Sequence, residues 1–210
     1  MDEIGLFPLG MVLLPTEQVP LHIFEPRYRE LIGECIAAGG DFGLVLADDD
    51  GMRRIGTRAT VVEVVDRFPD GRLNVIVEGG ERFRLVELTR GRSFQTAAIE
   101  PVDDQHDPGD PADAARAVEL FERLADLTGA DVEAPPLDTP QLSFALAARF
   151  DFAPSLKQEL LQETSERVRL RRLCALLEQA AETIERQQEI AARAQTNGRV
   201  DPGTIPGPDA

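Results

Sequence analysis

Short apolar runs separated by glycine and proline dominate the first hundred residues. Thr60–Phe68 is rich in β-branched residues, and Leu73, Val75 and Val77 alternate with polar positions, so both runs predict strands. Asp70-Gly71 between them predicts a hairpin, because glycine tolerates the positive φ of a tight turn. Gly79-Gly80 predicts a break before the next strand. The remaining runs that predict strands are Leu6–Leu9, Val12–Pro15, Val19–Phe24, Phe42–Ala47, Phe83–Leu85 and Ser93–Val102.

One helix is expected among these strands, from about Pro26 to Ala38. Proline suits the first helical position, where its missing N–H has no partner to lose. Leu31, Cys35 and Ala38 follow at spacings of four and three, which places them on one helical face. Gly39-Gly40 is expected to end the helix. Residues 1–102 therefore predict a small β barrel or sandwich with one inserted helix.

The pattern changes after this β-rich part. Residues 103–112 are acidic and contain proline and glycine, so we expect a solvated linker. Residues 113–195 have a helical period, and Ser165 is expected to cap a long final helix that becomes polar all round after Glu178. Residues 196–210 lack periodicity and are expected to be a disordered tail. The expected helices cover residues 113–128, 141–150, 154–162 and 165–194. The fold class is α+β.

The charge narrows the choice of partner. The chain has 38 acidic and 22 basic residues, a formal net charge of −16. A field of that sign repels phosphate backbones, so nucleic-acid binding is not expected. No apolar run is long enough to span a membrane, and the acidic start Met1-Asp2-Glu3 differs from a signal peptide. We expect a cytoplasmic protein whose two cysteines, Cys35 and Cys174, are buried thiols.

Catalytic and metal motifs are missing from the sequence. The only lysine, Lys157, is followed by Gln158, so there is no Gly-Lys-Ser/Thr phosphate loop. Lys157 is expected on an exposed helix, where it is a poor partner for a Ser-Lys dyad. Two cysteines and two histidines are too scattered for a zinc site. The aspartates around His106 are most simply a wet surface, so we expect no enzyme activity, no metal and no cofactor.

The most distinctive segment is the corner between the strand ending near Phe24 and the helix that follows it. One interpretation is structural: Leu21 and Ile23 enter the core, Phe24 covers the helix end, and Glu25 interacts with the helix N-terminus. The other is functional: the corner borders a groove for an extended peptide. The candidate peptide-binding residues are His22, Phe24, Glu25, Arg27 and Tyr28.

At this corner the chain resembles the N-terminal domain of Lon proteases. The resemblance covers about residues 4–102 in order, and the helical part matches more loosely. It is carried by Leu6–Leu9, Val12–Pro15, Pro20–Tyr28, Phe42–Leu46, Ile55–Thr57, Val61–Val64, Asp70–Val75, Val77–Gly79 and Arg82–Arg84.

This resemblance implies a PUA-like β pseudo-barrel followed by a helical bundle, in a domain that captures unfolded or damaged polypeptides. The sequence stops before any ATPase module, so we expect a non-catalytic, stand-alone substrate-recognition module whose partners are polypeptides. An adaptor or regulator that docks on a separate protease or another protein is the alternative. A small-molecule or RNA binder is a weaker analogy with other PUA-like folds. The oligomeric state is left open.

Overall fold

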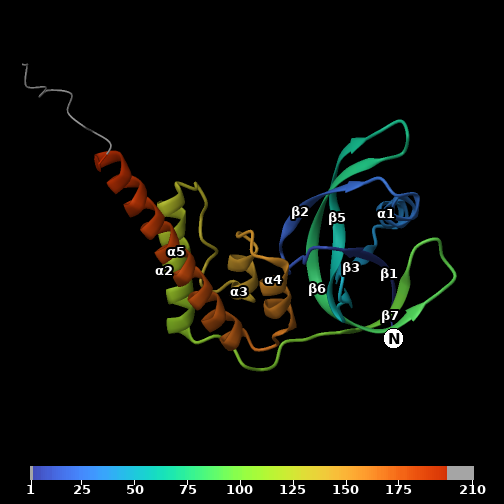
Figure 1. The fold of residues 1–210 in the computed structure, drawn as a ribbon. Helices are drawn as coiled ribbons and strands as arrows, with labels where there is room; N and C mark the ends of the chain where they lie inside the picture. The colour runs from blue at the N-terminus through green and yellow to red at the C-terminus, as the bar shows by residue number, and fades with distance from the viewer. Residues whose placement is uncertain (1, 198–210) are drawn as a thin grey trace, which may run out of the picture.

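The structure is a computed structural model, and it describes residues 2–197. Figure 1 shows two lobes side by side: the strands and α1 form a sheet lobe (residues 2–102), and helices α2 to α5 form a helical lobe (residues 111–197). An extended strap (residues 103–110) runs beneath both and joins them. The strands all precede residue 103, and within residues 2–197 every element after it is a helix.

The sheet closes on itself. Its strands follow the order β1-β7-β6-β5-β3-β4, and an additional parallel pairing of β1 with β3 joins the two ends into a ring of β1, β7, β6, β5 and β3. β2 lies outside the ring and pairs with β6. The strands are β1 (Asp2–Leu9), β2 (Gln18–Ile23), β3 (Asp41–Asp48), β4 (Gly51–Met52), β5 (Ile55–Arg67), β6 (Leu73–Thr89) and β7 (Thr96–Pro101).

Two strand predictions in the sheet lobe were wrong. Val12–Pro15 is a buried loop, although its apolar side chains predicted a strand. Gly79-Gly80 does not break a strand, because β6 continues through both residues. A Cβ atom on Gly79 would lie 2.1 Å from the carbonyl oxygen of Leu14. Gly79 therefore allows the buried loop to approach β6 closely.

The inserted helix α1 spans Pro26–Ala38, the range that the sequence predicts. Gly39 ends it in the left-handed conformation, with a φ of 63°, and donates its N–H to the carbonyl of Cys35. Leu31 and Cys35 are buried as expected, whereas Ala38 is exposed. Burial raises the pKa of the Cys35 thiol to about 11, so this residue is an unreactive core thiol.

The helical lobe consists of α2 (Pro111–Thr128), α3 (Leu142–Ala147), α4 (Pro154–Gln162) and α5 (Glu166–Asn197). The hydroxyl of Ser165 accepts the N–H of Val168 at 3.1 Å, which confirms the predicted cap of α5. The prediction that α5 turns polar after Glu178 was wrong, because Ala181 is fully buried. Thr196 and Asn197 belong to α5, and the rest of the expected tail lies outside the described residues.

One hydrophobic cluster joins the lobes. Val12, Leu14 and Leu46 of the sheet lobe pack in the same core as residues of all four helices of the helical lobe. The two lobes therefore share buried apolar surface, and separating them would expose this cluster to water. A second cluster, between α1 and the sheet, lies wholly within the sheet lobe.

Candidate polypeptide-binding surface

β2 has one free edge. It pairs with β6 in antiparallel register from Gln18 opposite Glu78 to Ile23 opposite Leu73, and within residues 2–197 no strand pairs with its other side. Pro20 lies in the middle of β2. Proline occurs in sheets where its missing N–H would face away from the neighbouring strand. The outward backbone groups of β2 are therefore those of Gln18, Pro20 and His22.

Polar side chains hold the exposed face of β2 in place. The ring Nδ1 of His22 lies 2.6 Å from Oδ1 of Asn74, whose amide donates to Asp66 at 3.0 Å. At the start of the strand, Gln18 donates to Glu78 at 2.6 Å. These contacts tie β2 to β6 and β5 through side chains as well as through the backbone, so the free edge is a rigid one.

Three rings meet at the C-terminal end of β2, and we call them the aromatic corner: His22, Phe24 and Phe68. The rings of His22 and Phe24 stack at a centroid distance of 5.9 Å, and Phe68 meets His22 edge-on at 6.2 Å. Phe24 is 59% exposed. Its ring therefore does not shield the helix end, contrary to the structural interpretation of the sequence. Exposed aromatic surface of this kind is typical of recognition sites.

The other candidate residues take different positions. Leu21 and Ile23 enter the core as expected. Glu25 is the N-cap residue of α1, as its expected place at the helix N-terminus implies, but its side chain makes no capping hydrogen bond and pairs with Arg27 at 2.8 Å. Tyr28 is buried against Phe7, at a centroid distance of 4.2 Å, because it lies on the sheet-facing side of α1. Its ring thus belongs to the core and not to an open groove.

A cleft between the lobes opens at the other end of β2. Its volume is about 530 Å³, and one wall is the turn into β2. The opposite wall is the proline-rich loop before α3 and the end of α3 itself. This interlobe cleft is lined by Thr16, Glu17, Gln18, Pro135, Pro136, Thr139, Ala145, Ala148 and Arg149. A single strand edge thus connects the interlobe cleft to the aromatic corner.

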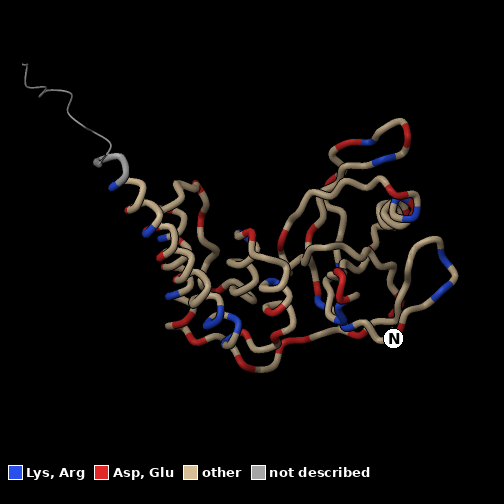
Figure 2. Tube along the Cα trace, viewed as in Figure 1, with Lys and Arg blue, Asp and Glu red and all other residues tan. Residues whose placement is uncertain are grey.

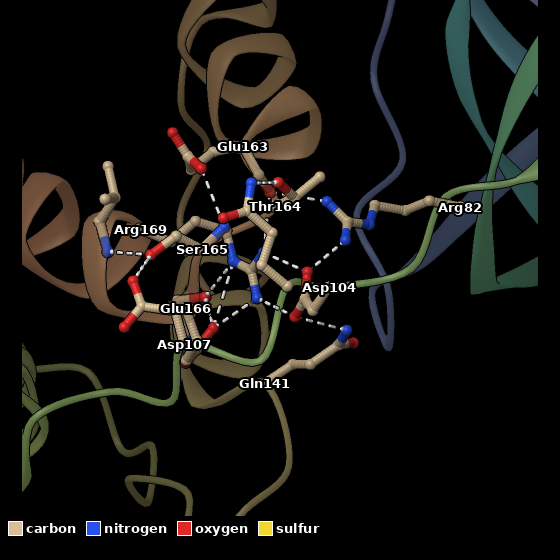
Figure 3. Close-up of polar contacts among 12 residues, drawn as sticks. Arg82, Asp104, Asp107, Gln141, Glu163, Thr164, Ser165, Glu166 and Arg169 are labelled. Carbon is tan, nitrogen blue, oxygen red and sulfur yellow. Dashed lines mark hydrogen bonds and ion pairs between the residues drawn. The ribbon is translucent and has the colours of Figure 1, made fainter.

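Buried ion pairs join the two lobes at the strap (Figure 3). Asp104 of the strap accepts from Arg82 of β6 and from both terminal nitrogens of Arg169 of α5, at 2.6 and 2.5 Å for the latter. Arg82 also donates to the carbonyls of Leu161 and Glu163 at 3.0 and 2.7 Å. Each lobe therefore contributes one arginine to the same carboxylate.

Asp104 corrects the expectation that the acidic segment is solvated. Burial raises the pKa of its carboxyl, but the bonds to Arg169 and the charge of Arg82 outweigh this and leave the pKa below its ordinary value. Asp107 is tied as well, by Ser165 at 2.6 Å and Arg167 at 2.9 Å. The strap lacks regular structure, yet its carboxylates Asp104 and Asp107 are structural.

Sequence patterns gave no sign of two residues that matter here. Phe68 stands just before the predicted hairpin turn, and only the pairing of β2 with β6 shows that its ring reaches His22. Arg82 lies in an alternating strand pattern in which a charged residue predicts a solvent-facing position. Its side chain is instead buried beneath the strap, because the closed ring turns this face of β6 toward the helical lobe.

The expected exposure of Lys157 was also wrong. Its ammonium lies 2.5 Å from Oε1 of Glu17, and both side chains are buried between α4 and the turn before β2. The other carboxyl oxygen of Glu17 accepts the N–H of Leu14 at 2.9 Å. A lysine held in this way by a carboxylate is not a free base for a Ser-Lys dyad.

Within residues 2–197, no group of three or more His, Cys, Asp or Glu side chains is arranged to hold a metal ion. Over the same residues, each helix is too short or too polar to pass through a bilayer. The aspartates near His106 therefore form no ligand cluster in the structure. The partners of Asp104 and Asp107 are arginine, serine and glutamine side chains.

Comparison with known proteins agrees with this architecture. The family model described as the ATP-dependent protease La (LON) substrate-binding domain matches residues 3–179. The Lon protease of Paraburkholderia phytofirmans is 28% identical over 95% of this chain and 27% of its own length. That of Phenylobacterium zucineum is 26% identical over 91% of this chain and 26% of its own length. The chain thus spans about a quarter of the length of these curated relatives.

Solved structures show the same fold. The crystal structure of a Lon N-terminal domain protein from Xanthomonas campestris matches with a TM-score of 0.66 and 28% identity, over 83% of this chain and 98% of that one. The N-terminal domain of the Lon protease of the Mycobacterium avium complex has a TM-score of 0.67 at 18% identity, which speaks for the fold alone. The resemblance found in the sequence is confirmed: this chain belongs to the family of ATP-dependent protease La (LON) substrate-binding domains.

Proposed function

We propose that this chain recognises extended polypeptide segments with exposed apolar side chains and holds them along the free edge of β2. Membership of a substrate-binding family supports polypeptide recognition in general. The observation that carries the specific site is the unpaired edge of β2, which runs from the interlobe cleft to the aromatic corner. An extended segment added as a further strand pairs its backbone with this edge and its side chains with the two ends.

The dimensions suit a short segment. Six residues of β2 span about 20 Å, at roughly 3.3 Å per residue. Pro20 removes one donor from the edge, which protects β2 against indiscriminate pairing with other strands. Affinity must then come from side chains, and the ring of Phe24 at this edge is 59% exposed. Recognition then depends more on the apolar side chains of the bound segment than on its exact sequence. A receptor for unfolded chains needs this breadth.

The activity proposed is binding without bond cleavage. The sequence has no phosphate loop, and the single lysine is committed to Glu17. We also assign the ring of five strands to the PUA-like pseudo-barrel, and α2 to α5 to the helical bundle, that the resemblance implies. The partner is a polypeptide and not a nucleic acid, because the net charge of −16 repels phosphate. Neither a cofactor nor a metal is part of the proposal.

Replacing Phe24 with alanine is expected to weaken binding of an unfolded protein about tenfold, which is typical of the loss of one aromatic hot spot. Fluorescence anisotropy with labelled, reduced and carboxymethylated α-lactalbumin measures the affinity. Leu88→Ala is the matched control, since Leu88 is an exposed apolar residue at the far end of β6. Both variants should melt like the parent protein, because both side chains are exposed. Equal affinities of the two variants would contradict the proposed site.

The adaptor alternative has one observation in its favour. Ile190 of α5 is 61% exposed, and it lies just beyond Gln188, whose side chain donates to the carbonyl of Leu127 near the end of α2. If the chain docks on another protein through this end, Ile190→Ser should weaken that contact while Phe24→Ala leaves it intact. The same pair of variants therefore separates the two functions.

A further inference from the structure

A second pocket lies between the strap, α5 and the loop before α3. Thr139 of this loop lines both this pocket and the interlobe cleft. The volume of the second pocket is about 450 Å³, within the range of roughly 300–1,000 Å³ found for ligand pockets. Leu142 and Leu170 form a buried floor, and Leu137 is an exposed wall. We call it the strap pocket. Its lining is Asp104–Gly109, Pro111, Ala114, Leu137, Thr139, Gln141, Leu142, Glu166 and Leu170.

The strap pocket has a rigid entrance. The strap is fixed to the start of α5 by the N–H of Gln105, which donates to the carbonyl of Thr164 at 2.9 Å. At Gly109 the strap passes so close to α5 that a Cβ atom would lie 2.4 Å from Leu170. A pocket built between such fixed segments is present before a ligand arrives, which lowers the entropic cost of binding.

The charge around the strap pocket is negative. Its lining includes the carboxylates of Asp104, Asp107 and Glu166 and contains neither lysine nor arginine. The arginines that pair with Asp104 and Glu166 lie beneath them, since the side chains of Arg82 and Arg169 are almost completely buried. Figure 2 shows acidic residues along the strap. The lining itself therefore presents carboxylates and no cation, although Arg167, which is 36% exposed, pairs with Asp107 beside it.

Counting the neighbouring groups gives the same sign. Seven carboxylates lie in or next to the lining and only four arginines pair with this set, which leaves an excess of three negative charges. The carboxylates are Asp103, Asp104, Asp107, Asp110, Asp113, Glu163 and Glu166, and the arginines are Arg82, Arg167, Arg169 and Arg171.

From the apolar floor and this acidic rim, we propose that the strap pocket binds an aliphatic side chain that stands next to lysine or arginine in a polypeptide. The aliphatic group removes the floor from water, and the neighbouring cation lies at the carboxylates of the rim. That the ligand is a polypeptide rests on the proposed function. The chemistry of the strap pocket itself is independent of the edge of β2.

Short peptides test this assignment. Three labelled peptides of about eight residues are compared by fluorescence anisotropy: alternating Leu-Arg, alternating Leu-Glu, and alternating Ser-Arg. All measurements use the Phe24→Ala background, so that the contribution of the aromatic corner is reduced. We expect the Leu-Arg peptide to bind at least about tenfold more tightly than either other peptide, and to lose affinity as salt is raised from about 20 to 300 mM.

The deciding variants are Leu137→Ser and Val132→Ser. Both residues are exposed and apolar and lie in the same loop, but only Leu137 lines the strap pocket. Leu137→Ser should weaken binding of the Leu-Arg peptide about fivefold, and Val132→Ser should leave its affinity unchanged. Equal binding by the two variants, or equal binding of the Leu-Arg and Leu-Glu peptides, overturns the assignment. Because only Leu137 lines the strap pocket, a difference between the two loop variants does not depend on whether clients also use β2.

Discussion

Replacing Asp104 with alanine is expected to lower the free energy of unfolding by about 3–5 kcal/mol, the usual cost of removing one partner from a buried ion pair. Asp104 faces Arg82 and Arg169, one from each lobe, and the side chains of both arginines are almost fully buried. Without the carboxylate, two guanidinium groups stay buried near each other. In the variant, Arg82 still donates to the carbonyls of Leu161 and Glu163, and Arg169 still pairs with Glu166. These remaining contacts keep the loss of unfolding free energy within this range. Urea denaturation measures it.

Asp103→Ala is the matched control, because Asp103 is the exposed neighbour of Asp104 on the strap. Its effect should stay within about 0.5 kcal/mol, as for other surface substitutions. The pKa of Asp104 is lowered in the folded state, so its contribution is present above the ordinary carboxyl pKa of about 4 and is lost as the pH falls below it. The parent protein should therefore lose more stability than Asp104→Ala between pH 6 and pH 3. Parallel losses would contradict this role of Asp104.

Replacing Lys157 with methionine is expected to cost about 3 kcal/mol, because the carboxylate of Glu17 is then buried with only one N–H donor. The double variant Lys157→Met/Glu17→Gln should recover most of this loss, since no unpaired charge remains. Thermal and urea melts of the two single variants and the double variant give the coupling energy. If the double variant loses as much unfolding free energy as the two single variants added together, Lys157 and Glu17 do not act as a unit.

Patterns along the chain predicted most elements, because their signals are local. Pro26 begins α1 and Gly39 ends it. Ser165 caps α5, and Asp70-Gly71 lies in the hairpin turn between β5 and β6. Each of these depends on a few neighbouring residues whose backbone preferences or hydrogen bonds do not need the rest of the fold. Such signals are readable from one sequence.

The errors arose where distant segments meet. Gly79 suggested a break, but β6 continues through it. A glycine is needed there because the loop at Leu14 crosses β6 too closely for a Cβ atom. Asp104 and Lys157 looked like surface charges, but their partners lie 65 and 140 residues away in the sequence. Periodicity gives no information about pairs at that separation. Tyr28 was misplaced for a simpler reason: the face of α1 that meets the sheet includes it as well as Leu31 and Cys35.

The candidate site was only partly predictable. His22 and Phe24 are exposed together at the end of β2, and their neighbour Phe68 comes from a different strand end. The free edge of β2 follows from the closed ring, which leaves this strand outside. Strand order within a ring is a property of the whole sheet, so no motif near residues 18–23 announces it.

The edge of β2 can be tested most directly with backbone-modified ligands. An extended apolar peptide that binds the chain is made in two N-methylated forms, in which alternate amides are blocked on one edge or on the other. Addition as a strand predicts that only one form loses affinity, by about tenfold or more, since the methyl groups then remove hydrogen bonds to β2 and collide with it. If both forms bind as tightly as the unmodified peptide, the backbone of β2 takes no part in recognition.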